Sequence, residues 1–91
     1  MSKKPATKAE RDYMDKVAQL PCALTGEYPV ELHHIREGQG LSQRASNFLV
    51  IPLSPEAHRG PLGVHGDQAL LRIHKKTELD LLAETIERVF R

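Results

Sequence analysis

The stretch Glu31-Leu32-His33-His34-Ile35-Arg36 places two adjacent histidines at the end of a short apolar run. Residues Tyr28–Ile35 predict a strand, because the apolar residues Val30 and Leu32 stand at alternate positions. Imidazole is a common metal ligand, and its ordinary pKa suits a general base near neutral pH. The pair can therefore divide two roles, one residue binding a metal ion and one accepting a proton from water. Taken in isolation, such a pair is more often two surface residues of a strand.

Two further histidines, His58 and His65, follow the next apolar segment of the chain. Residues Phe48–Ile51 predict a short buried strand, and Pro52 either ends this strand or marks a sheet edge. His58 falls in a short predicted helix, and His65 falls in a loop that its neighbouring glycines allow to turn sharply. Each histidine alone suits a surface or capping position equally well. Together with the first pair, they predict a metal site across an antiparallel hairpin.

Strand geometry limits how the adjacent histidines can act, because neighbouring side chains of a regular strand point to opposite faces. His33 and His34 can approach one ion only where the strand ends or bulges, and Gly38 and Gly40 allow such a break. The alternation also favours unequal roles for the two residues. Asn47, which precedes the second strand, is either a turn residue or a group that orients a catalytic histidine.

Predicted helices flank the hairpin on both sides in the sequence. Residues 7–20 form an amphipathic helical pattern that begins at a capping box of Thr7 and Glu10, and Pro21 ends it. This order of elements predicts an α+β fold. The other predicted helices start at Ser54, Asp67 and Thr77, and the last of them carries an apolar stripe of Leu79, Leu82, Ala83, Ile86, Val89 and Phe90.

The length of 91 residues predicts one domain, residues 1–91, with residues 1–5 as a disordered lead and residues 28–66 as the metal-site core. So short a chain is marginally stable without a metal or a partner subunit. The single cysteine, Cys22, excludes an internal disulfide and a four-cysteine zinc site. With no membrane-length apolar run and no signal core, we expect a cytoplasmic protein without membrane association. The net charge of +1 predicts that any DNA contact is local.

The order of strand, His-His, loop, asparagine, strand and histidine-bearing helix resembles the HNH endonucleases of the ββα-metal fold. The residues that carry the resemblance are Leu32-His33-His34-Ile35, Asn47, Ile51-Pro52-Leu53 and His58. More closely, the segment Lys8–His65 resembles the compact phage and prophage nucleases of the recombination-enhancement (Ref-like) group, which depend on the recombinase RecA. This resemblance implies a single HNH-type nuclease domain, in which a ββα-metal core is flanked by an N-terminal helix and C-terminal helices.

The resemblance also implies a role for each matching residue. His34 would be the general base that activates a water molecule, and Asn47 would orient it. The ligands of one divalent metal ion would be His33, His58 and His65, with Mg or Mn in catalysis or with Zn or Ni bound. The implied activity is metal-dependent hydrolysis of DNA phosphodiester bonds.

Three arginines near the histidines, Arg36, Arg44 and Arg59, are placed to clamp DNA phosphates. The expected partners are DNA and a recombinase such as RecA, in phage recombination or DNA processing. The chain is expected to be a monomer or a homodimer formed through its C-terminal helix. The alternative function is a zinc-stapled module that binds DNA or a protein without nuclease activity.

The chain departs from this family in its cysteines. Many relatives carry Cys-x-x-Cys before the first strand and a further cysteine after the second strand. The matching residues here are Cys22, Thr25 and Ser54, so we expect no second, structural zinc ion. The flanking helices would supply that stability instead. His74, in the predicted helix that follows Asp67, is expected to be solvated and not a ligand.

Overall fold

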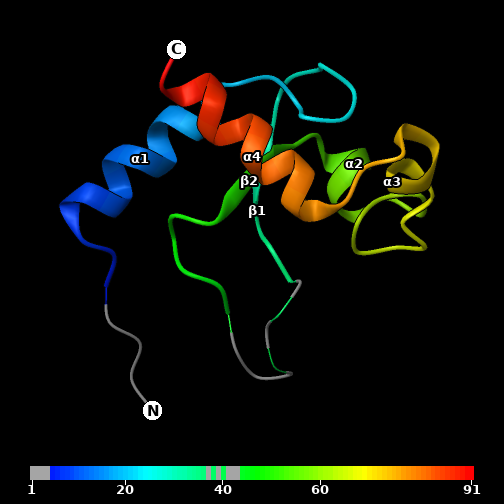
Figure 1. The fold of residues 1–91 in the computed structure, drawn as a ribbon, viewed down its shortest axis with the longest axis horizontal. Helices are drawn as coiled ribbons and strands as arrows, with labels where there is room; N and C mark the ends of the chain where they lie inside the picture. Colours follow the sequence, from blue (N-terminus) through cyan, green and yellow to red (C-terminus); the bar gives the residue numbers. More distant parts are fainter. Residues whose placement is uncertain (1–4, 37, 39, 41–43) are drawn as a thin grey trace.

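The computed structural model describes residues 5–36, 38, 40 and 44–91, and it folds them around a two-stranded antiparallel hairpin (Figure 1). The predicted α+β fold is confirmed: a helix precedes the hairpin, and short helices and a longer C-terminal helix follow it. In chain order the elements are α1 (Lys8–Ala18), β1 (Glu31–His34), β2 (Val50–Leu53), α2 (Pro55–Arg59), α3 (Ala69–His74) and α4 (Glu78–Val89).

The first strand is shorter than predicted. We expected Tyr28–Ile35, whereas β1 covers only Glu31–His34. Pro29 has no N–H to give to a strand ladder, and the Tyr28 side chain is exposed, so nothing holds these residues in the sheet. The paired residues are Glu31 with Leu53, Leu32 with Pro52, His33 with Ile51, and His34 with Val50.

The second strand lies two residues later than predicted, at Val50–Leu53 in place of Phe48–Ile51. The residues before it form a turn, in which the backbone N–H of Leu49 donates to Ser46 O. Pro52 lies inside the strand and does not end it. Both strands of a two-stranded sheet are edges, where a proline is tolerated.

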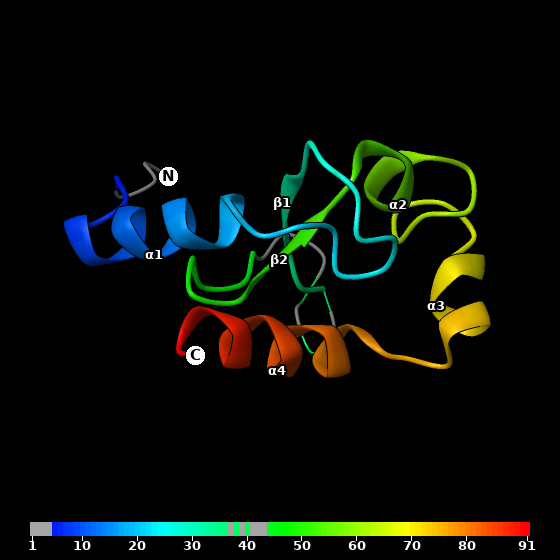
Figure 2. The same ribbon diagram turned by 90° about the horizontal axis from the view of Figure 1, so that it is seen from above.

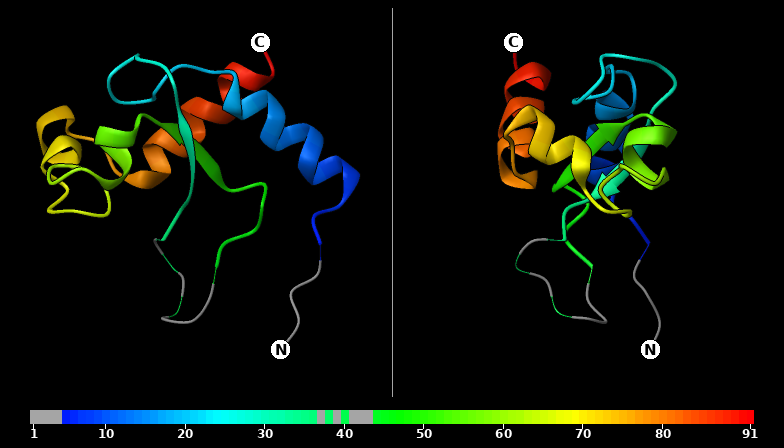
Figure 3. Two further views of the ribbon diagram at one scale, coloured as in Figure 1. Left: turned by 180° about the vertical axis from the view of Figure 1, so that it is seen from behind. Right: turned by 90° about the vertical axis from the view of Figure 1, so that its right-hand side faces the viewer.

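Helices surround the hairpin. α1 and α4 both contact β2, and α2 contacts both strands (Figure 2). Figures 1 and 3 place α2 and α3 at one end of the molecule and the start of α1 at the other. Among the described residues, no helix has the length and apolar character needed to cross a membrane. The side chains of Ile51, Leu53 and Leu81 are fully buried at the centre of the core.

The predicted helix starts are largely confirmed. Thr7 Oγ1 accepts from the N–H of Glu10, and the Glu10 carboxylate accepts from the N–H of Thr7, which completes the capping box of α1. This helix ends at Ala18, two residues before the predicted end. Ser54 caps α2, and a capping box of Thr77 and Asp80 begins α4. The predicted N-cap of α3 is wrong by one residue: Gln68 is the N-cap, and the Asp67 carboxylate, one residue earlier, accepts from the N–H of Ala69.

The apolar stripe predicted for the last helix is wrong in part. Leu79 is 48% exposed and Phe90 is 73% exposed. The first residue of the helix, Glu78, determines which face is buried, because its carboxylate bonds to His33 in the hairpin. Residues three, four and seven positions after Glu78 share its face of the helix and are therefore buried with it. The buried residues of α4 are Glu78, Leu81, Leu82 and Thr85.

This rotation predicts different effects for two leucines of the same helix. Leu81→Ala removes a fully buried side chain and should lower the free energy of unfolding by about 2–5 kcal/mol. Leu79→Ala, at a half-exposed position, should change it by less than about 1 kcal/mol. Urea unfolding followed by circular dichroism measures both values. Equal losses in the two variants would contradict the orientation of α4 described here.

Candidate metal centre

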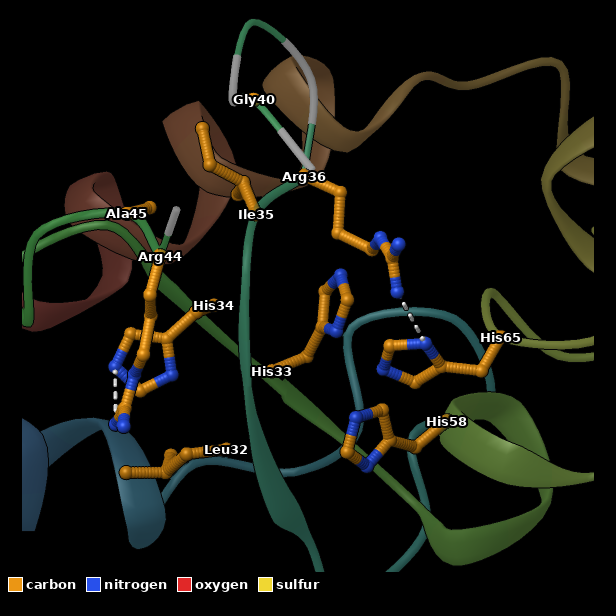
Figure 4. A pocket seen from close by; sticks show the side chains of 10 residues that line it. All are labelled: Leu32, His33, His34, Ile35, Arg36, Gly40, Arg44, Ala45, His58 and His65. Atoms are coloured by element: carbon orange, nitrogen blue, oxygen red, sulfur yellow. Dashed lines mark hydrogen bonds between the residues drawn. The ribbon is translucent and has the colours of Figure 1, made fainter. Parts of the chain in front are cut away.

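Three imidazole rings from separate segments converge beside the hairpin (Figure 4). His33 comes from β1, His58 from α2, and His65 from the loop between α2 and α3. One potential ligand atom from each residue lies within 4.8 Å of the other two. His33 is buried, His58 is partly buried and His65 is exposed, so the group has a closed wall and an open side. The structure thus brings together the three predicted ligands, and this group can hold a metal ion.

The chain after α2 folds back on that helix and sets His65 beside His58. The N–H of Val64 donates to Ala57 O at 2.9 Å, and the N–H of His65 donates to His58 O at 3.0 Å. Gly63 makes this return possible, because a Cβ atom there would lie only 2.6 Å from Ala57 O. The local sequence therefore fixes the spacing between two of the three histidines.

Two of the imidazole rings each have a carboxylate bonded to one ring nitrogen. His33 Nε2 lies 2.5 Å from Glu78 Oε2, and His58 Nδ1 lies 2.9 Å from Glu31 Oε1. A carboxylate on one ring nitrogen orients the ring and raises its basicity as a metal ligand, a common arrangement behind protein metal sites. The nitrogens left for a shared ion are Nδ1 of His33 and Nε2 of His58.

Glu31 is itself held by an arginine. The guanidinium of Arg59 donates through Nε and Nη2 to both Glu31 oxygens, at distances of 2.8 to 3.1 Å. Arg59 and, to a smaller extent, His58 lower the pKa of Glu31 to about 2, so its carboxylate is ionised at neutral pH. The structure thus places Arg59 behind the metal group, which consists of His33, His58 and His65. Its predicted contact with DNA stays a prediction.

Arg36 borders the open side of the group, with Nη1 3.3 Å from Nδ1 of His65. Burial lowers the pKa of His65, and the neighbouring histidines lower it further, which favours the neutral, metal-binding ring. A guanidinium can only donate, so Nδ1 accepts in this contact and the ring proton sits on Nε2. A metal ion on Nε2 therefore requires the exposed Arg36 side chain to turn away.

His34 points to the other side of β1, away from the ring of His33 (Figure 4). Its Nε2 lies 2.9 Å from Asn47 Oδ1, and Asn47 Nδ2 donates to Glu10 Oε2 at 3.3 Å. An ionised carboxylate only accepts, so Glu10 requires the amide nitrogen of Asn47 and turns the amide oxygen toward His34. His34 then carries its proton on Nε2, and its Nδ1 has the lone pair that a general base needs.

Arg44 makes a competing contact with the same ring. Its Nη2 lies 3.0 Å from His34 Nε2, and both groups are donors in the tautomer that Asn47 selects. We assign the hydrogen bond to Asn47, because Asn47 is partly buried and fixed by Glu10, whereas the Arg44 contact is exposed. Burial lowers the pKa of His34, and the charge of Arg44 adds to this effect, while Asn47 opposes it. The ring is therefore neutral at pH 7.

One cleft contains both His34 and the three-histidine group. It has a volume of about 430 Å³, and His34 lines it together with all three residues of the metal group. The guanidinium-bearing residues Arg36 and Arg44 line it as well. A bound molecule can therefore contact the metal group, His34 and two positive charges at once.

Sequence reasoning missed three carboxylates of this site. Glu31 stands two residues before His33, so strand alternation could have placed both on one face. Glu10 was assigned only its capping role, which uses one of its oxygens and leaves the other for Asn47. Glu78 lies 45 residues from its partner His33, and no local pattern signals that contact.

No protein-family model, no curated protein and no solved structure matches this chain. The findings that bear on function are therefore the α+β fold, the helix that follows the hairpin, and the three-histidine group. The finer likeness to HNH nucleases rests on the sequence motifs alone.

The metal group predicts stabilisation by a transition-metal ion. Zinc at a free concentration about 100 times its dissociation constant should stabilise the protein by about 2.7 kcal/mol, seen as a rise in the melting temperature. His58→Ala should abolish most of this rise, because it removes one of the three ligands. His74→Ala, which deletes an exposed histidine of α3, is the matched control and should keep it. Equal zinc responses in the two variants would contradict the proposed ligand set.

The carboxylate of Glu31, which bonds to the His58 ring, should strengthen metal binding. Glu31→Gln removes the charge that orients the His58 ring and should weaken zinc binding by about 10- to 100-fold in calorimetric titration. Glu27→Gln, at an exposed residue nearby, removes the same charge without touching a histidine ring and should leave affinity unchanged. A similar weakening in both variants would mean that only overall charge matters.

Proposed function

We propose that this protein is a metal-dependent HNH-type endonuclease that hydrolyses phosphodiester bonds in DNA. The observation that carries the proposal is the shared cleft, which contains the three-histidine group and a fourth imidazole of fixed tautomer, His34. A purely structural metal site has no need of a separate imidazole that is held by an amide and a carboxylate. Hydrolysis needs both a cation and a base.

In this mechanism His34 removes a proton from the attacking water through Nδ1. Asn47 accepts from the Nε2–H of the same ring and keeps the proton there, so that Nδ1 stays available. Glu10 holds the Asn47 amide in the required orientation. These three residues act on the nucleophile side of the reaction and leave the metal group free for the phosphate.

The donor set of His33, His58 and His65 fits a divalent ion, because two of the rings have a carboxylate behind them and one side of the group is open. When bound, such an ion supplies Lewis-acid stabilisation of the charge on the phosphate and on the leaving oxygen. Imidazole ligands favour zinc, nickel or manganese over magnesium. We therefore expect activity with manganese or nickel to exceed activity with magnesium.

Arginines complete the proposed site on the substrate side. Arg36 and Arg44 line the cleft, and guanidinium groups bind phosphate through two parallel hydrogen bonds. Arg59 is bonded to Glu31 and does not line the cleft, so its proposed DNA contact would lie outside the cleft. The resemblance further suggests a role in phage recombination or DNA processing with a recombinase such as RecA as partner. The exposed Leu79 and Phe90 of α4 would suit a homodimer contact.

The deciding experiment is conversion of supercoiled plasmid to nicked or linear DNA with Mg²⁺, Mn²⁺, Ni²⁺ or Zn²⁺. His34→Ala should lower the rate by about 10²- to 10⁴-fold, because it removes the general base. The same variant should keep the zinc-dependent rise in melting temperature, since His34 lies outside the three-residue metal group.

His74→Ala is the control for this test and should cut plasmid at the wild-type rate. If wild-type protein and His34→Ala behave alike, the nuclease assignment is wrong. Tight zinc binding and chelator-induced unfolding without any metal-dependent cleavage would instead support the zinc-stapled binding module.

A further inference from the structure

A second cavity adjoins the histidine cleft at Arg36. It has a volume of about 540 Å³ and is lined by residues of α3, by the connection to α4 and by the first residue of α4. Figure 2 shows α3 at the end of the molecule, with the chain running from it into α4. Arg36 lines both cavities, so the two are neighbours that share this residue.

The second cavity concentrates positive charge on a protein whose net charge is only +1. Its basic lining residues are Arg36, Arg72, Lys75 and Lys76. The carboxylate in the lining, Glu78, bonds to His33 and to the backbone N–H of Arg36, so it faces the hairpin. Lys76 also reaches Glu84 at 2.6 Å, which leaves three cations to dominate the cavity.

Lys75 holds an unusual backbone position at the rim. It ends α3 in the left-handed conformation, with φ of 55°, where glycine is the residue that fits without strain. Its N–H donates to carbonyls of the last turn of α3, as a glycine there would. A charged side chain therefore stands where the backbone alone would favour glycine, and it stands next to Arg72 in the lining of the cavity.

We propose that the second cavity is a phosphate subsite for a nucleic-acid strand whose neighbouring phosphate lies in the histidine cleft. The path of the strand from one cavity to the other rests on the proposed nuclease function. Two adjoining cavities that each carry basic residues and meet at Arg36 suit a ligand with anions repeated along a chain. Arg72 and Lys75 then hold the part of the strand that is not cut and set its position over the metal group.

The test is binding of a fluorescent single-stranded DNA of about 12 nucleotides, in chelator, followed by anisotropy over a series of salt concentrations. Lys75→Gly removes the charge while relieving the backbone, so it should weaken binding with an unchanged or higher melting temperature. Arg72→Ala with Lys75→Gly should weaken binding about tenfold at low salt and reduce the slope of log K against log[salt] by about 1.4.

The control pair, Lys16→Ala with Arg88→Ala, removes the same charge from exposed residues of α1 and α4. It should leave the salt slope unchanged. Equal losses in the two double variants would overturn the subsite, because they would show a response to overall charge alone. Displacement of the DNA by poly-glutamate of equal charge would also overturn it, in favour of an acidic protein partner.

Binding in chelator separates this inference from the proposed function. Weakened binding in the Lys75→Gly variant, with no plasmid cleavage by any protein, would retain the subsite and reject the nuclease. Normal cleavage with unchanged DNA binding and unchanged KM in the double variant would retain the nuclease and reject the subsite. Where both hold, the double variant should raise KM for a short oligonucleotide with little change in kcat.

Discussion

The hydrogen bond between His33 and Glu78 is the interaction on which the rest of the site depends. It joins the centre of the hairpin to the first turn of α4, and both side chains are buried. A buried carboxylate that loses its partners is strongly destabilising, and the second oxygen of Glu78 accepts from the N–H of Arg36. The pair thus fixes the ring of His33, the path of the chain beyond β1 and the face that α4 turns to the core.

Hydrogen bonds hold the segment before the hairpin in place. Cys22 and Thr25 close a tight turn, in which the thiol accepts from the N–H of Thr25 at 3.4 Å. The N–H of Ala23 donates to the carbonyl of Pro52, which attaches this turn to β2. Ser54, directly after β2, caps α2. Hydrogen bonds therefore engage Cys22, Thr25 and Ser54.

Local chemistry made much of the fold predictable from the sequence. The capping boxes at Thr7 and Thr77 form as expected, because each involves residues only three positions apart. The shift of β2 and the rotation of α4 escaped prediction, because both depend on distant partners and not on the local apolar pattern. The same distinction holds in the site: the three histidines were visible as residue types, whereas the contact between Glu78 and His33 spans 45 residues.

The two faces of β1 place two adjacent imidazoles in different surroundings. Glu31 and His33 share one face, and His34 lies on the other, so neither imidazole competes for the partners of its neighbour. Each imidazole is fixed by a helix from a different end of the chain. α4 holds His33 through Glu78, and α1 holds His34 through Glu10 and Asn47. The flanking helices therefore position the imidazoles of the cleft as well as supporting the hairpin, and a change in how either helix packs on the hairpin would move one imidazole relative to the other.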